Sequence, residues 1–83
     1  MSHKAELSRV IERFPEQARV IREVFLREER FRSACEDYAL ACDCLSRFEA
    51  LPDAQGRTEI SDYRSVIAEL EKEIAALLAS ASR

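Results

Sequence analysis

The sequence predicts an all-α fold, in which an antiparallel, coiled-coil-like helical hairpin carries a short extra helix at its N-terminal end. The strongest indication is a seven-residue apolar repeat near the C-terminal end, with a second apolar residue three positions after the first. Its members are Ile60, Tyr63, Ile67, Leu70, Ile74, Leu77 and Ala81. This is the a/d pattern of a coiled-coil seam, so we expect a helix over 60–81 that packs against another helix. One Gly and two Pro in 83 residues suit long helices.

A second long helix is expected over 16–50, because a heptad pattern continues through this range. The apolar residues at or beside its a and d positions are Ile21, Val24, Phe25, Phe31, Cys35, Tyr38, Cys42 and Leu45. Glu28 places a charge at an a position, beside Glu29. The sequence leaves open whether the helix is continuous or breaks near 27–29.

Residues 51–59 are predicted to form the turn of the hairpin. They contain Pro52, Asp53 and the single Gly, which are typical turn residues. A short connection between two long helices makes them antiparallel neighbours. In this arrangement Tyr38 should meet the region from Leu70 to Ile74. Thr58 or Ser61 is the expected N-cap of the last helix.

A short helix over 5–14 is predicted from the i, i+3, i+4, i+7 spacing of Leu7, Val10, Ile11 and Phe14, with Pro15 ending it. The helix over 60–81 is too short to cover Ile21, Val24 and Phe25 on the longer one. The N-terminal helix or a second subunit could cover them. Because a two-helix layer buries little apolar surface, we expect the hairpin to assemble into an oligomeric bundle.

Three stretches resemble the YdcH-like proteins, a family of small bacterial helical-hairpin proteins of unknown function. They are Phe14-Pro15-Glu16 followed by Ile21; Phe31 with Glu36-Asp37-Tyr38, Asp43 and Glu49; and Ser61-Asp62 leading to Leu70-Glu71-Lys72-Glu73-Ile74 and Leu77. The chain departs from the family pattern at Arg27-Glu28, at Ser65-Val66-Ile67 and in a longer turn. The resemblance implies a helical hairpin that assembles, and it implies no catalytic residues.

The residues that could support chemistry are few, so we expect no enzyme activity, no cofactor and no metal. Cys35 and Cys42 lie two helical turns apart, too far for a disulfide, and are expected to be small buried apolar residues. Cys44 lies on another face and could crosslink subunits on oxidation. His3, close to the N-terminus, has no companion ligands. The sequence has no Gly-rich phosphate loop and no Ser or Cys placed near a usable His.

The net charge is −3, and the arginines between Arg13 and Arg32 are interleaved with glutamates. Nucleic-acid binding is therefore an unlikely third interpretation. No apolar run is long enough to span a membrane. Three cysteines without a CxxC pair favour the cytoplasm. The leading hypothesis is a scaffold that associates with itself through its heptad seams; the alternative is a small chaperone or adaptor that holds a helix of a client protein. The N-terminal part to Arg32 carries positive net charge and the remainder negative, so the two could attract each other.

Overall fold

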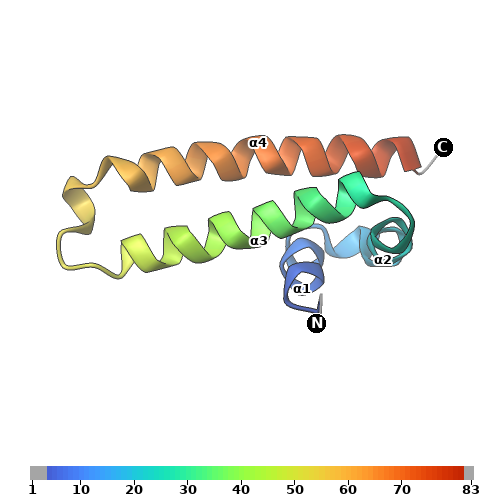
Figure 1. The fold of residues 1–83 in the computed structure, drawn as a ribbon, viewed down its shortest axis with the longest axis horizontal. Coiled ribbons are helices and arrows are strands. Elements are labelled where there is room, and N and C mark those ends of the chain that lie inside the picture. Colours follow the sequence, from blue (N-terminus) through green and yellow to red (C-terminus); the bar gives the residue numbers. More distant parts are fainter. Residues whose placement is uncertain (1–3, 82–83) are drawn as a thin grey trace.

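The computed structural model describes residues 4–81, and all regular secondary structure within them is helical (Figure 1). This confirms the all-α prediction. The described chain forms α1 (Lys4–Arg13), a 3-10 turn η1 (Pro15–Gln17), α2 (Ala18–Arg27), α3 (Glu29–Glu49), a second 3-10 turn η2 (Ala54–Gly56) and α4 (Thr58–Ala81). None of these helices is long and apolar enough to cross a membrane.

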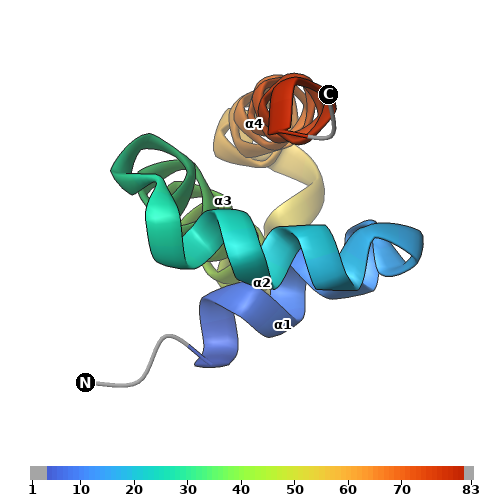
Figure 2. The ribbon, with the colours of Figure 1, turned by 90° about the vertical axis from the view of Figure 1, so that its right-hand side faces the viewer.

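The two longest helices, α3 and α4, lie side by side and run in opposite directions (Figure 1). The N-terminal helices run across this pair rather than along it (Figure 2). α1 packs on α3, while α2 packs on both α3 and α4. The N-terminal part of the chain therefore covers one side of the α3–α4 pair.

Residues 16–50 do not form one helix, which corrects that expectation at two places. Pro15 starts a 3-10 turn after Phe14, whose backbone leaves the helical region (φ −127°, ψ 63°). Glu28 is extended (φ −114°, ψ 110°) and separates α2 from α3. Of the two alternatives left open by the sequence, the structure has the break.

Arg32 holds this break in place. The last carbonyl groups of a helix lack partners within it, and the Arg32 guanidinium donates a 2.6 Å hydrogen bond to the carbonyl oxygen of Phe25. The same guanidinium lies 5.9 Å from the centroid of the Phe25 ring. The first turn of α3 thereby caps the last turn of α2.

The break lets α2 turn its apolar face into the core. Ile21, Val24 and Phe25 are buried within the single chain, so no second subunit is needed to cover them. α1 contributes Val10, which is fully buried, while Leu7, Ile11 and Phe14 pack against the core from its edge. The remaining buried residues are Phe31, Ala34, Cys35, Tyr38, Ala39, Ala41, Ile74 and Leu78.

α4 differs from the prediction at both ends. It begins at Thr58, two residues earlier than expected, so Thr58 is the first helical residue and not the N-cap. At the other end Leu78 is fully buried, whereas Leu77, the predicted d residue, is only partly buried. The reason is that this end of α4 contacts both α2 and α3, so its buried stripe is wider than a two-helix seam.

Ion pairs join the N-terminal part of the chain to the acidic remainder. Arg9 lies 2.6 Å from Asp43, and Arg13 lies 3.0 Å from Glu71. The Tyr38 hydroxyl donates to the same Glu71 carboxylate at 3.1 Å, within the region of α4 predicted for it. These side chains are partly exposed, so each pair stabilises the fold by at most about 1 kcal/mol.

Truncating Leu78 should lower the free energy of unfolding much more than truncating its neighbour Leu77. We expect Leu78→Ala to lower the free energy of unfolding by about 2–5 kcal/mol, because it opens a cavity in the core. Leu77→Ala should cost about 1 kcal/mol, since Leu77 is only partly buried. Urea unfolding of both variants measures this difference. A larger loss for Leu77→Ala would mean that the heptad register holds to the end of α4.

The capping interaction can be tested with Arg32→Met, which keeps an aliphatic side chain near Phe25 but removes the hydrogen bond. We expect a loss of about 1–3 kcal/mol in the free energy of unfolding, because the Phe25 carbonyl loses its charged donor. Arg32→Lys, which keeps a charged donor, is the control and should lose less. Equal stability of Arg32→Met and the unaltered protein would contradict this role.

Candidate interaction groove

The three cysteines differ in how far they are exposed to solvent. Cys35 is buried, Cys42 and Cys44 are partly exposed, and all three are free thiols. No group of three or more His, Cys, Asp or Glu side chains within residues 4–81 could hold a metal ion. His3 lies outside the described residues.

Burial makes the Cys35 thiol a poor nucleophile. Desolvation, assisted by the negative charges of Glu36 and Glu6, raises its pKa to about 12. Desolvation also raises the pKa of Cys42. Since the thiolate is the reactive form, these side chains serve as small apolar residues of the core. Tyr38 is likewise held neutral, because burial raises its pKa, with the Cys42 and Glu71 charges adding to the effect.

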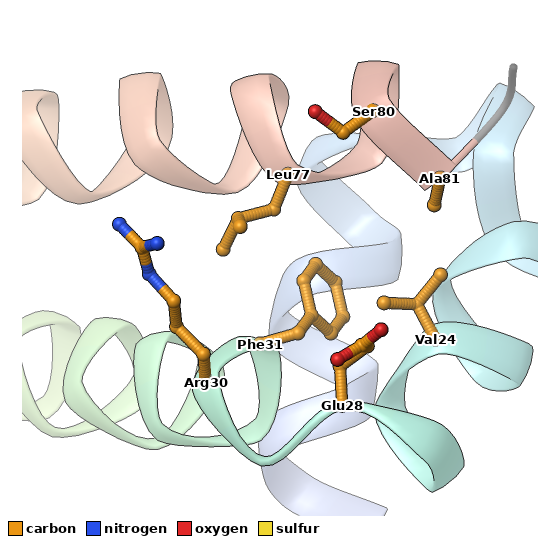
Figure 3. A pocket seen from close by; sticks show the side chains of 7 residues that line it. All are labelled: Val24, Glu28, Arg30, Phe31, Leu77, Ser80 and Ala81. Carbon is orange, nitrogen blue, oxygen red and sulfur yellow. The ribbon is translucent and has the colours of Figure 1, made fainter.

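One hollow of about 280 Å³ lies where α2 meets α3, opposite the last turns of α4 (Figure 3). Its lining is Val24, Glu28, Arg30, Phe31, Leu77, Ser80 and Ala81. Phe31, Val24 and Leu77 point into the gap between the helices in Figure 3, and the first two are core residues. Arg30 is engaged with Glu73 of α4 at 3.8 Å. This hollow is the open end of the hydrophobic core.

A second recess runs between α3 and α4, and we call it the α3–α4 groove. It comprises a hollow of about 280 Å³ between the two helices and an adjoining one of about 360 Å³ lined by α4 alone, and the two share Val66 and Leu70. Its lining residues are Asp37, Leu40, Ala41, Cys44, Tyr63, Ser65, Val66, Glu69, Leu70 and Glu73. The groove is thus built from the middle of both long helices.

Helical periodicity explains why these residues face away from α1. Leu40 and Cys44 lie one turn apart on α3, and Tyr63, Val66 and Leu70 follow one another at spacings of three and four on α4. Asp43, one turn after Leu40, reaches Arg9 of α1, yet Leu40 and Val66 stay exposed. The α3–α4 groove is therefore on a part of the pair that the N-terminal helices leave uncovered.

The floor and walls of the groove are apolar and unusually exposed. Leu40 is 63% exposed and Val66 is 47% exposed, and the two side chains line the same hollow. Single exposed apolar residues are common on protein surfaces, but adjacent ones that line one recess mark an interaction site.

One end of the groove is held rigid by aromatic contacts. Tyr63 stacks on Phe48 with ring centroids 5.6 Å apart and an interplanar angle of 30°. Arg57 lies 5.6 Å from the centroid of the Phe48 ring on this same end of the hairpin. A hydrogen bond with Cys44 raises the pKa of Tyr63, which ties the two walls together. The Tyr63–Phe48 and Tyr63–Cys44 contacts thus join α3 and α4 at this end of the groove.

The charged residues of the groove all carry the same sign. Asp37, Glu69 and Glu73 line it, and no Lys or Arg does. Glu69 and Glu73 have distant, exposed partners, Lys72 at 3.9 Å and Arg30 at 3.8 Å. Asp37 is exposed and pairs with no cation among residues 4–81. The surface is an apolar strip with an acidic border.

Of the residues predicted to mediate helix packing, only Tyr63 and Leu70 line this groove. Ile21, Val24, Phe25, Phe31, Cys35, Tyr38 and Ile74 are in the core with Val10, while Leu7, Ile11, Phe14, Cys42, Leu45, Ile60, Ile67 and Leu77 are partly buried. Sequence reasoning missed Leu40 and Val66, because neither occupies an a or d position. The signal that the sequence offered for this groove was a large apolar residue outside the a and d positions.

Comparison with known proteins returned no match: no family model, no curated protein and no solved structure is similar to this chain. The resemblance to the YdcH-like family stays a prediction.

The raised thiol pKa predicts a loss of stability at alkaline pH. An unfolded Cys35 releases its proton from about pH 9.0, whereas the folded thiol keeps its proton to about pH 12. In this interval the unfolded state binds fewer protons, so the free energy of unfolding falls as the pH rises, by up to about 1.4 kcal/mol per pH unit. Below pH 9 this contribution is fully present.

Urea unfolding under reducing conditions, repeated as the pH is raised through 9, measures this effect. Cys35→Ala should flatten the slope, although its absolute stability will be lower because of the smaller side chain. Cys44→Ala is the matched control and should keep the slope of the unaltered protein. An unchanged slope in Cys35→Ala would show that Cys35 is not the group responsible.

Proposed function

We propose that the chain is a non-enzymatic helical protein–protein interaction module that associates with further copies of itself through the α3–α4 groove. The observation that carries this proposal is the exposure of Leu40 and Val66 side by side in one recess between two well-packed helices. Covering this apolar strip would remove it from water at a gain of about 25 cal/mol per Å².

The proposed contact differs from the heptad-seam association that the sequence suggested. Phe31, Cys35 and Ile74 fill the space inside one chain, so these three seam residues are not available to a partner. A bundle of several copies would have to form through surfaces that remain outside this core. The α3–α4 groove is the apolar surface of this kind that both long helices share.

The shape and chemistry of the groove favour a protein partner over a small molecule. Small-molecule sites enclose their ligand and place a few convergent polar groups around it. Here the recess is a shallow strip along two helices, and its polar groups are carboxylates at the border. Side chains from another helix, with basic residues beside them, suit such a surface.

The setting we propose is the bacterial cytoplasm, supported by the YdcH-like resemblance and by three free thiols. The alternative function is a chaperone or adaptor that holds a client helix in the same groove. Both functions use the same surface, so the test must first decide whether a second copy of the chain is the occupant.

Sedimentation equilibrium over a hundredfold dilution, with helicity recorded alongside, provides this test. We expect the unaltered protein to associate at the higher concentrations and Val66→Asp or Leu40→Asp to weaken association at least about tenfold, because a charge would be buried against the partner. Both positions are exposed, so the melting temperature should change little.

Leu51→Asp is the matched control, since Leu51 is also an exposed apolar residue but lies in the turn. It should associate like the unaltered protein. A fully helical monomer at every concentration would contradict self-association and leave the groove to a client helix. Association that survives both groove substitutions would show that another surface is used.

A further inference from the structure

We infer that the association is head-to-tail, with Leu26 of one copy seated in the α3–α4 groove of the next. This inference depends on the proposed function and adds the surface of the second copy that enters the groove. It joins two features of the fold that packing within one chain leaves unexplained: an apolar groove bordered by carboxylates, and an exposed leucine on a helix that carries three arginines and one glutamate.

Leu26 is the first of these two surfaces. It is 80% exposed, more than any other large apolar side chain described. It projects from the outer face of α2, because Ile21, Val24 and Phe25 of this helix face the core. A leucine side chain in this position can insert into a recess on another molecule, and we call Leu26 the knob.

The surroundings of Leu26 carry positive charge. Arg22 lies one turn before it and Arg19 lies two turns before it, while Arg27 follows it directly. Glu23 is the acidic residue of α2 itself and lies 3.6 Å from Arg19, while the exposed Glu28 and Glu29 follow at the break and the start of α3. Arg22 and Arg27 form no ion pair with any side chain in residues 4–81. Two guanidinium groups beside the knob therefore remain free to meet carboxylates.

The α3–α4 groove offers the complementary charges. Its apolar strip is bordered by Asp37, Glu69 and Glu73, so a leucine with arginines beside it would bring opposite charges together at the border. The hollow that includes Leu40 and Val66 measures about 280 Å³, which is ample for one leucine side chain. The volume of the hollow and the charges at its border therefore both favour Leu26 as the occupant.

A symmetric contact of groove against groove fits less well. In a two-fold arrangement each acidic border would meet a copy of itself, and Asp37, Glu69 and Glu73 would repel their counterparts. A contact between α2 of one copy and the groove of another avoids this repulsion. Such a contact is heterologous, so a pair of copies keeps a free groove on one copy and a free Leu26 on the other, and association continues beyond two copies.

The knob and the groove cannot satisfy each other within one chain. α2 runs across the end of the α3–α4 pair (Figure 2), and Leu26 points outward from the core. The groove lies in the middle of both long helices. A second molecule is therefore required.

A mixing experiment tests this geometry. Leu26→Asp removes the knob and Val66→Asp removes the groove, and each variant alone should sediment as a monomer where the unaltered protein forms larger species. In an equimolar mixture, Leu26 of the Val66→Asp chain and the groove of the Leu26→Asp chain are both intact. The mixture should therefore form a complex of two chains and stop there.

Cys44 reports occupancy of the groove in the same mixture. In chains that also carry Cys42→Ser, alkylation of Cys44 in the Leu26→Asp chain should slow several-fold on adding the Val66→Asp chain. Leu26→Met is the conservative control and should still associate. Added salt should weaken the complex, because the charges at the border are exposed.

Two results would overturn the inference. If Leu26→Asp associates like the unaltered protein while Val66→Asp does not, the groove is used but Leu26 does not enter it. If the mixture stays monomeric, the contact is not between these two surfaces. A monomeric unaltered protein would overturn both this inference and the self-association proposed above.

Discussion

The fold depends on the break at Glu28 and on the hydrogen bond from Arg32 to the Phe25 carbonyl that holds it. A straight helix through α2 and α3 would extend roughly 48 Å, against roughly 36 Å for α4. The apolar residues of α2 would then project beyond the end of α4 into water. With the break, α2 turns across the ends of α3 and α4, and Ile21, Val24 and Phe25 become part of one core.

The same constraint explains why the α3–α4 pair is covered on one side and not on the other. α1 and α2 together are short, and the break and Pro15 direct both to the same side of the pair (Figure 2). The ion pairs Arg9–Asp43 and Arg13–Glu71 attach α1 on that side. No described segment is left to cover Leu40 and Val66, so the groove is a direct consequence of how the chain is divided among its helices.

Much of the fold could be predicted from the sequence, because helix position follows from local periodicity and from turn residues. The apolar spacing located α1 and α4 to within a few residues, and the charge at Glu28 indicated where a break could occur. Heptad counting treats each helix as if it had one partner. It therefore missed Leu78, which lies where α4 has two partners.

The groove could not be predicted from periodicity for a related reason. An apolar residue outside the seam can be a tolerated surface residue or part of an interaction site, and only the position of its neighbours distinguishes the two. Leu40 and Val66 come from different helices, so their adjacency depends on how α3 and α4 are aligned. The exposure of Leu26 likewise depends on the direction of α2, which periodicity alone does not give.

The sign of the charge around an exposed apolar surface decides which partner can cover it. The apolar strip alone would fit a second groove, a client helix or an exposed leucine equally well, because hydrophobic burial has no direction. The carboxylates of Asp37, Glu69 and Glu73 disfavour an identical surface and favour a basic one. In this chain the most exposed large apolar side chain described, Leu26, stands on α2 beside Arg22 and Arg27, which form no ion pair among the described residues. This is the physical reason to place a second copy of the chain, and not an unrelated helix, in the groove.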